Sequence, residues 1–182
     1  MHKVKYILLI PALFIFSSLS AITHSPDVGK AETSYKQKDV LKIMERVADW
    51  QFKQWETNGS RWPMWDWTNA AGYTGMLALA DISKKKAYLT NLVSISERLN
   101  WNTGPRRFYA DDYCIGQTYS ILYGKYKDRK MIVNFQRLAD SIVNQPHTES
   151  LEWKNSIRLR EWAWCDALFM GPPALSYLST VT

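Results

Sequence analysis

The strongest constraint on the fold is an alternation between two kinds of helical segment. The amphipathic segments are residues 37–56, 87–100 and 129–144. The segments that follow each of them carry few charges, and they are residues 68–82, 111–126 and 161–182. A helix with one apolar stripe is covered on one side, whereas a helix with few charges must be covered on most sides. No segment shows the period-two alternation of a strand. We therefore predict an all-α fold of nested helical hairpins, with inner helices packed against outer ones.

Internal similarity suggests that the hairpins repeat. Aligning Gly116 with Gly171 places Asp111 over Asp166, and each acid stands five residues before its glycine. Trp67 takes the same place in the preceding hairpin. Since the inner helices of a closed ring begin at one rim, equivalent positions gather there. We therefore expect Asp111 and Asp166 to face each other across a cleft.

The walls of this cleft are expected to be aromatic, from Trp67, Trp164 and the loop at residues 62–67. Tryptophan faces stack on the apolar faces of sugar rings. A carboxyl group desolvated beside Trp164 and Leu168, as expected for Asp166, has a raised pKa, and a second carboxylate nearby raises it further. Such a pair suits acid–base chemistry on sugars.

A purely structural explanation stays open for each of these features. Aspartates near a helix start are often N-caps or favourable first-turn acids, and Asp111, Asp112 and Asp166 all lie near predicted starts. The nine Trp and ten Tyr residues can equally belong to a large core.

The N-terminus has the pattern of an export signal. Lys3 and Lys5 precede an apolar run at residues 6–16, followed by small residues to position 21. The run is short for a membrane span. We expect a signal peptide at 1–21, a flexible lead-in at 22–36 and a domain at 37–182. The mature protein would be periplasmic or secreted, without a stable membrane anchor.

Charge and histidine content argue against two other classes of function. Removing Lys3 and Lys5 lowers the net charge from +6 to +4, and the remaining basic residues are scattered, so no nucleic-acid partner is expected. The histidines His2, His24 and His147 have no metal-ligand spacing, so no metal site is predicted.

Cys114 and Cys165 both lie in apolar helical surroundings. We expect buried free thiols rather than a disulfide, although an exported protein could join them.

Three motifs resemble glycoside hydrolase family 105, the unsaturated rhamnogalacturonyl and glucuronyl hydrolases related to family 88. They are WDWTNAAGYTGM, GPRRFYADDYCIGQTY and EWAWCDALFMGPP. The resemblance extends over residues 37–182 and implies a six-hairpin (α/α)6 barrel. The chain is long enough for about three of the six hairpins, so it resembles only the N-terminal half.

The resemblance implies a pectin-degrading type of hydrolase that acts on rhamnogalacturonan-type oligosaccharides with a 4,5-unsaturated uronic acid at the non-reducing end. An aspartic acid protonates C4, water adds at C5, and the hemiketal opens; no metal or organic cofactor takes part. Asp166 matches the proton donor and Asp111 its partner. The implied substrate-binding residues are Trp67, Asn69, Asp112, Trp164 and Met170, with core packing an equal alternative for Met170.

Two alternatives belong to other classes. A truncated, inactive fragment would at most bind carbohydrate or a partner through its aromatic cleft, because further substrate-binding residues would lie in the missing half. An epimerase-type helical barrel would usually need a histidine base, and neither His24 nor His147 lies in a motif. Binding of a disaccharide without turnover would favour the fragment.

Overall fold

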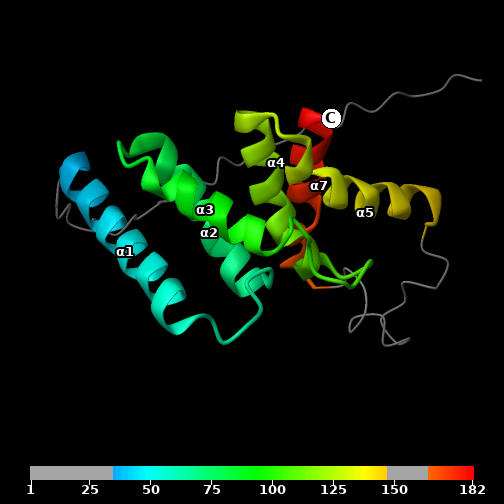
Figure 1. Ribbon diagram of the computed structural model, residues 1–182, viewed down its shortest axis with the longest axis horizontal. Helices are drawn as coiled ribbons and strands as arrows, with labels where there is room; N and C mark the ends of the chain where they lie inside the picture. Colours follow the sequence, from blue (N-terminus) through cyan, green and yellow to red (C-terminus); the bar gives the residue numbers. More distant parts are fainter. Residues whose placement is uncertain (1–34, 147–163) are drawn as a thin grey trace, which may run out of the picture. The chain divides into compact units, whose positions relative to one another are not determined.

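The computed structural model describes residues 35–146 and 164–182, and every regular element within them is helical (Figure 1). The predicted signal peptide and nearly all of the lead-in lie outside the described residues. The elements are α1 (Gln37–Asn58), α2 (Trp67–Ile82), α3 (Ala87–Arg98), η1 (Ala110–Tyr113), α4 (Cys114–Tyr126), η2 (Arg129–Met131), α5 (Val133–Asn144), α6 (Ala167–Met170) and α7 (Pro172–Val181). The prediction of an all-α fold is confirmed.

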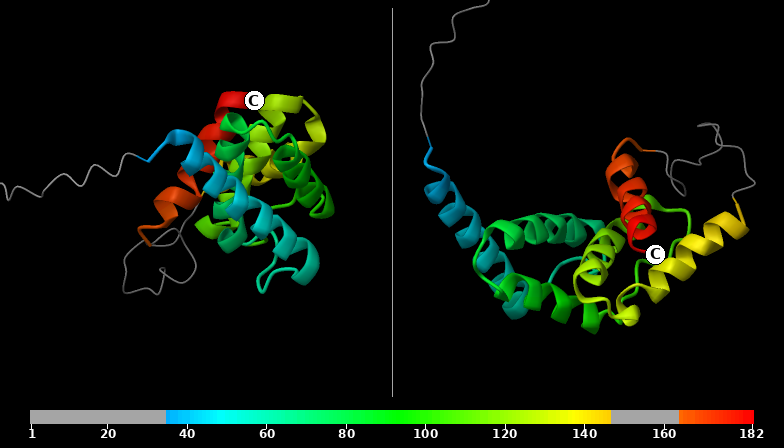
Figure 2. Two further views of the ribbon diagram at one scale, coloured as in Figure 1. Left: turned by 90° about the vertical axis from the view of Figure 1, so that its left-hand side faces the viewer. Right: turned by 90° about the horizontal axis from the view of Figure 1, so that it is seen from above.

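Helix α4 is the central helix of the described unit. It lies between α2 and α7, and residues 112–120 are all buried (Figures 1 and 2). The three segments predicted to be inner helices are therefore neighbours, and they alternate along the chain with α1, α3 and α5. This arrangement is consistent with a fragment of a six-hairpin toroid.

Local sequence signals set several helix ends. The Asp66 side chain accepts a hydrogen bond from Thr68 N at 2.9 Å and so caps α2. Lys127 ends α4 in the left-handed conformation, with φ of 59°. The predicted C-terminal segment is divided at Gly171, and α7 restarts with Pro172 at its first position, where proline is favoured.

Helix α5 packs closely against the central helix through one aromatic ring. Phe135 is fully buried, and a Cβ built on Gly116 would lie 2.5 Å from its ring atoms. Tyr113 meets the same ring edge-on, with centroids 6.0 Å apart. Glycine at 116 therefore allows a contact that any side chain would obstruct.

Aromatic contacts attach α1 to the rest of the unit. Phe52 stacks on Tyr88 with centroids 5.9 Å apart, and Trp55 meets Tyr73 edge-on at 5.0 Å. Such pairs add a specific geometry to the burial of apolar area.

The apolar stripe predicted for α1 is buried only in part. The periodicity places Val40, Met44, Val47, Ala48, Gln51 and Trp55 near one stripe. In the described structure the first three are exposed, whereas Ala48 is buried and Gln51 and Trp55 are half-buried. Phe52, which lies outside that stripe, is buried as well. The covered part of α1 is therefore its C-terminal half.

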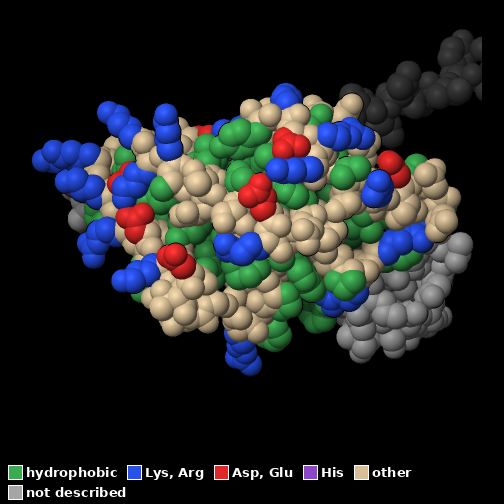
Figure 3. All heavy atoms as spheres, viewed as in Figure 1, with side chains coloured by type: hydrophobic (Ala, Val, Ile, Leu, Met, Phe, Trp, Pro, Cys, Tyr) green, Lys and Arg blue, Asp and Glu red, His purple; other side chains and the backbone are tan. Residues whose placement is uncertain are grey.

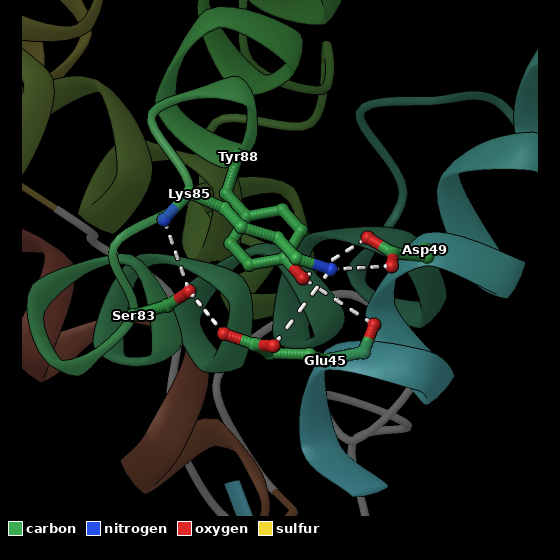
Figure 4. A network of polar contacts seen from close by, with 5 residues as sticks. All are labelled: Glu45, Asp49, Ser83, Lys85 and Tyr88. Atoms are coloured by element: carbon green, nitrogen blue, oxygen red, sulfur yellow. Dashed lines mark hydrogen bonds and ion pairs between the residues drawn. The ribbon is translucent and has the colours of Figure 1, made fainter. Parts of the chain in front are cut away.

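A polar network also holds α1 against the turn between α2 and α3 (Figure 4). Ser83 Oγ donates to Glu45 Oε1 at 2.6 Å, and Lys85 Nζ donates to Asp49 Oδ2 at 2.7 Å. Tyr88 OH donates to Asp49 Oδ1 at 3.0 Å. The hydrogen bond from Lys85 lowers the pKa of Asp49, so its modest contribution to stability is lost as the pH falls through that lowered pKa.

Basic side chains are spread over the face shown in Figure 3, with several over α1 and acidic ones between them. Among the described residues, no helix combines the length and apolarity that a bilayer crossing requires.

Neither cysteine forms a disulfide in the described structure, and their environments differ. Cys114 is buried, as predicted, and burial raises the pKa of its thiol to about 12. The prediction of burial is wrong for Cys165, which is exposed. Cys165 lies in the turn ahead of α6, before the first inward-facing residue, Ala167.

Candidate active site

Asp111 and Asp166 meet at one small cavity of about 160 Å³. Asp111 belongs to η1 and Asp166 directly precedes α6, and these two short elements pack together. The cavity is lined by Tyr109, Ala110, Asp111, Trp164, Asp166 and Ala167. The structure therefore confirms that the two acids share a hollow with Trp164, while their catalytic role remains a prediction.

The turn that carries Asp166 is anchored to the central helix. Gln117 Nε2, buried in α4, donates a hydrogen bond to the backbone oxygen of Phe169 at 2.8 Å. Ala167 and Met170 on the same turn are buried. This attachment fixes the position of Asp166 relative to η1, which directly precedes α4.

The environment of Asp111 favours its protonated form. Burial raises the pKa of Asp111, and the negative charge of Asp166 raises it further. Arg106 lowers that pKa, while Asp112 and Asp66 add smaller increases. Asp111 is only half-buried, so it remains accessible from the cavity.

The predicted desolvation of Asp166 is not found in the described residues. Asp166 is exposed, and its neighbours Trp164 and Leu168 are 56% and 73% exposed. The single turn of α6 directs Ala167 and Met170 inward, three residues apart, so the residues between and before them point outward. Within the described structure, Asp111 is therefore the more enclosed acid.

The structural alternative, in which Asp166 serves as a helix N-cap, is not supported by its side-chain contacts. Asp166 occupies the N-cap position of α6, but within the described residues its side chain makes no capping hydrogen bond. Asp66 does cap α2, and its charge acts on Asp111. Asp66 was not among the predicted site residues, although it stands next to Trp67, the residue aligned with the two acids.

Two predicted substrate-binding residues lie at the start of α2, away from the cavity lining. Trp67 is partly exposed there but does not line the cavity. Asn69 is buried, and its Oδ1 accepts from Trp55 Nε1 at 3.1 Å and from Ser60 Oγ at 3.0 Å. Asn69 Nδ2 donates to Pro63 O at 3.0 Å. Asn69 thus holds the loop before α2, and the structure gives no support to substrate contact.

Asp112 and Met170 are also turned into the interior. Met170 is 4% exposed and belongs to the core, as the packing alternative predicted. Asp112 is fully buried, and both of its carboxylate oxygens accept hydrogen bonds from Arg106. Adjacent acids in one 3-10 turn point in different directions, so only Asp111 of the pair reaches the cavity.

Tyr109 is a cavity residue that sequence reasoning missed. Its ring lies under the guanidinium of Arg106, 3.7 Å from the centroid to Cζ. The signal available was its position two residues before Asp111, in the motif RRFYADD.

The described residues contain a second hollow. They contain no cluster of side chains that could bind a metal ion. A larger groove of about 720 Å³ lies between α1 and α3, and none of the predicted site residues lines it. Within 35–146 and 164–182, no cluster of three or more His, Cys, Asp and Glu side chains is arranged to hold a metal ion.

Asp111→Asn is expected to raise the free energy of unfolding at pH 7 by less than about 1 kcal/mol, since the acid is half-buried and screened. A raised folded-state pKa means that ionised Asp111 destabilises the folded state above that pKa. The gain should shrink as the pH falls and vanish below the ordinary value of 3.8, where the carboxyl group is protonated in both states. Urea titrations at several pH values measure it. The exposed Asp140→Asn is the control, and a loss of stability at pH 7 would contradict the prediction.

Comparisons with known proteins relate this chain to glycoside hydrolases. Residues 43–182 match the family described as Glycosyl Hydrolase Family 88. An unsaturated 3S-rhamnoglycuronyl hydrolase of Formosa agariphila is 32% identical over 117 residues, which cover 61% of this chain and 30% of that protein. A protein of the same name from Alteromonas sp. strain LOR is 27% identical over 129 residues, covering 64% and 31%. The match thus spans about a third of the length of these relatives. No solved structure matches significantly.

Proposed function

The chain belongs to glycosyl hydrolase family 88, and from this premise we propose that it is part of a hydrolase for oligosaccharides that end in an unsaturated uronic acid. The single observation that carries the proposal is the meeting of Asp111 and Asp166 at one aromatic cavity. The motifs around these acids further support placement in family 105, with this chain as the N-terminal half of the barrel.

The proposed reaction is hydration of the C4=C5 double bond. A carboxylic acid delivers a proton to C4, water adds at C5, and the hemiketal opens and releases the remaining sugar. The family resemblance assigns the donor role to Asp166 and the partner role to Asp111. The pKa of Asp111 is raised by burial and by the negative charge of Asp166, and this supports two carboxyl groups close enough to interact electrostatically.

The aromatic residues beside the acids support a sugar as the ligand. Tyr109 and Trp164 line the same cavity, and such rings stack on the apolar faces of pyranose rings. The names of the two relatives favour an unsaturated rhamnoglycuronyl substrate, whereas the motif resemblance favours a rhamnogalacturonan product. Both substrate classes carry the unsaturated uronyl group on which the proposed chemistry acts. The basic and apolar N-terminus supports export to the periplasm or the medium.

A second candidate is a binding fragment without turnover. It is favoured by the exposure of Asp166 and Trp164, which leaves the cavity open on one side in the described structure. A carboxyl group that stays exposed to solvent is not desolvated by the aromatic residues beside it.

The test is a pair of measurements on the purified chain with two unsaturated disaccharides, one of each substrate class. Loss of the ultraviolet absorbance of the C4=C5 bond reports turnover, and titration calorimetry reports binding. Turnover of either disaccharide supports the proposed hydrolase and identifies its class. Binding without turnover supports the fragment, and absence of both overturns the carbohydrate assignment.

A further inference from the structure

One buried carboxylate holds the loop that leads into η1. Asp112 is fully buried, and its Oδ2 accepts from Arg106 N at 2.7 Å and from Arg106 Nε at 3.1 Å. Asp112 Oδ1 accepts from Arg106 Nη2 at 2.6 Å. The Arg106 side chain is 49% exposed, so this ion pair joins the interior to the protein surface. A two-pronged contact of this kind fixes orientation as well as distance.

The other end of the loop closes on the same carboxylate. Gly104 N donates to the backbone oxygen of Asp112 at 3.2 Å. A Cβ built on Gly104 would lie 2.3 Å from Cγ of Asp112, which is too close for any side chain. Residues 104–112 therefore form a closed loop around the Asp112 side chain.

This closed loop carries three of the residues that line the cavity, namely Tyr109, Ala110 and Asp111. Tyr109 N donates to Arg106 O at 3.2 Å, and Asp112 N donates to Tyr109 O at 3.1 Å. The Arg106 guanidinium covers the ring of Tyr109 at 3.7 Å. Asp111 stands between Tyr109 and Asp112 in the chain, so its direction depends on the same contacts.

We infer that Arg106 and Asp112 form a clamp that positions Tyr109 and Asp111 at the cavity, so that both clamp members are positioning residues. The identity of Asp111 as a working acid rests on the proposed function. The clamp itself is testable without turnover, so its failure and the failure of the proposed function are distinguishable.

The test compares three variants of the whole chain. Asp112→Asn keeps the shape of the side chain but removes its charge, and Arg106→Lys keeps the positive charge but cannot form the two-pronged contact. Asp111→Asn is the matched control, because it alters the neighbouring acid in the same turn without touching the clamp. Amide hydrogen exchange is measured at Gly104, Tyr109 and Asp112 and, for comparison, across α4. Carbon-13 spectra follow the titration of the Asp111 carboxyl group, which the control variant assigns.

In Asp112→Asn and Arg106→Lys, exchange at the three loop amides should accelerate at least tenfold while the α4 amides keep their protection. The Asp111 titration should shift to lower pH in both variants, because opening the loop reduces the burial that raises its pKa. The shift in Arg106→Lys is the decisive one, since the charge near Asp111 is retained. Unchanged exchange and titration in that variant would overturn the inference, and so would equal acceleration throughout α4, which indicates global destabilisation only.

Discussion

Asp166→Asn is expected to reduce turnover of an unsaturated uronyl disaccharide by about 10²- to 10⁴-fold, the usual contribution of a general acid. Asparagine has the same shape but no acidic proton, so protonation of C4 loses its donor. The fold should be unaffected, because the Asp166 side chain makes no capping bond within the described residues. The measurement is the rate of loss of double-bond absorbance, made on this chain or on a full-length relative that carries the matching aspartate.

Two companion variants make this result interpretable. Asp140→Asn removes an exposed acid on α5 and should leave the rate unchanged. Asp111→Asn should change the pH dependence of the rate, since it removes a titrating group that interacts electrostatically with Asp166. Full activity of Asp166→Asn across the pH range would remove this residue from the mechanism.

Phe135→Ala is expected to lower the free energy of unfolding by about 3–5 kcal/mol. The ring is fully buried between α5 and α4, where it meets Tyr113 and lies against Gly116. Truncation removes these contacts and leaves a cavity that the packed helices can fill only in part. Urea denaturation followed by circular dichroism measures the loss.

A double-mutant cycle with Gly116→Ala tests the cause of that loss. In the wild-type background the added methyl group overlaps the Phe135 ring, so Gly116→Ala should destabilise the protein. In the Phe135→Ala background the space is open, and alanine should then stabilise the α4 helix by up to about 1 kcal/mol. The same effect of Gly116→Ala in both backgrounds would show that the ring and the glycine do not interact.

The meeting of the two acids was predictable because it follows from the repeat. Asp111 and Asp166 stand at the same distance before equivalent glycines, and neighbouring inner helices present equivalent positions at one rim. The roles of the residues around them were not predictable in this way. Asn69 and Asp112 are polar residues in motif positions, yet both form hydrogen bonds inside the fold, where leaving such a group without a partner is costly.

The chain by itself determined the helical class, the order of covered and half-covered helices, and which two carboxyl groups come together, because these depend on periodicity and repeat spacing along the sequence. The tertiary structure alone decided which acid is the more enclosed, which of Asp111 and Asp112 reaches the cavity, and how much of the predicted α1 stripe is covered. These depend on the direction of one turn and on which elements pack against a helix. A rotation of a single residue position exchanges an inward for an outward side chain without changing the pattern that encodes the helix.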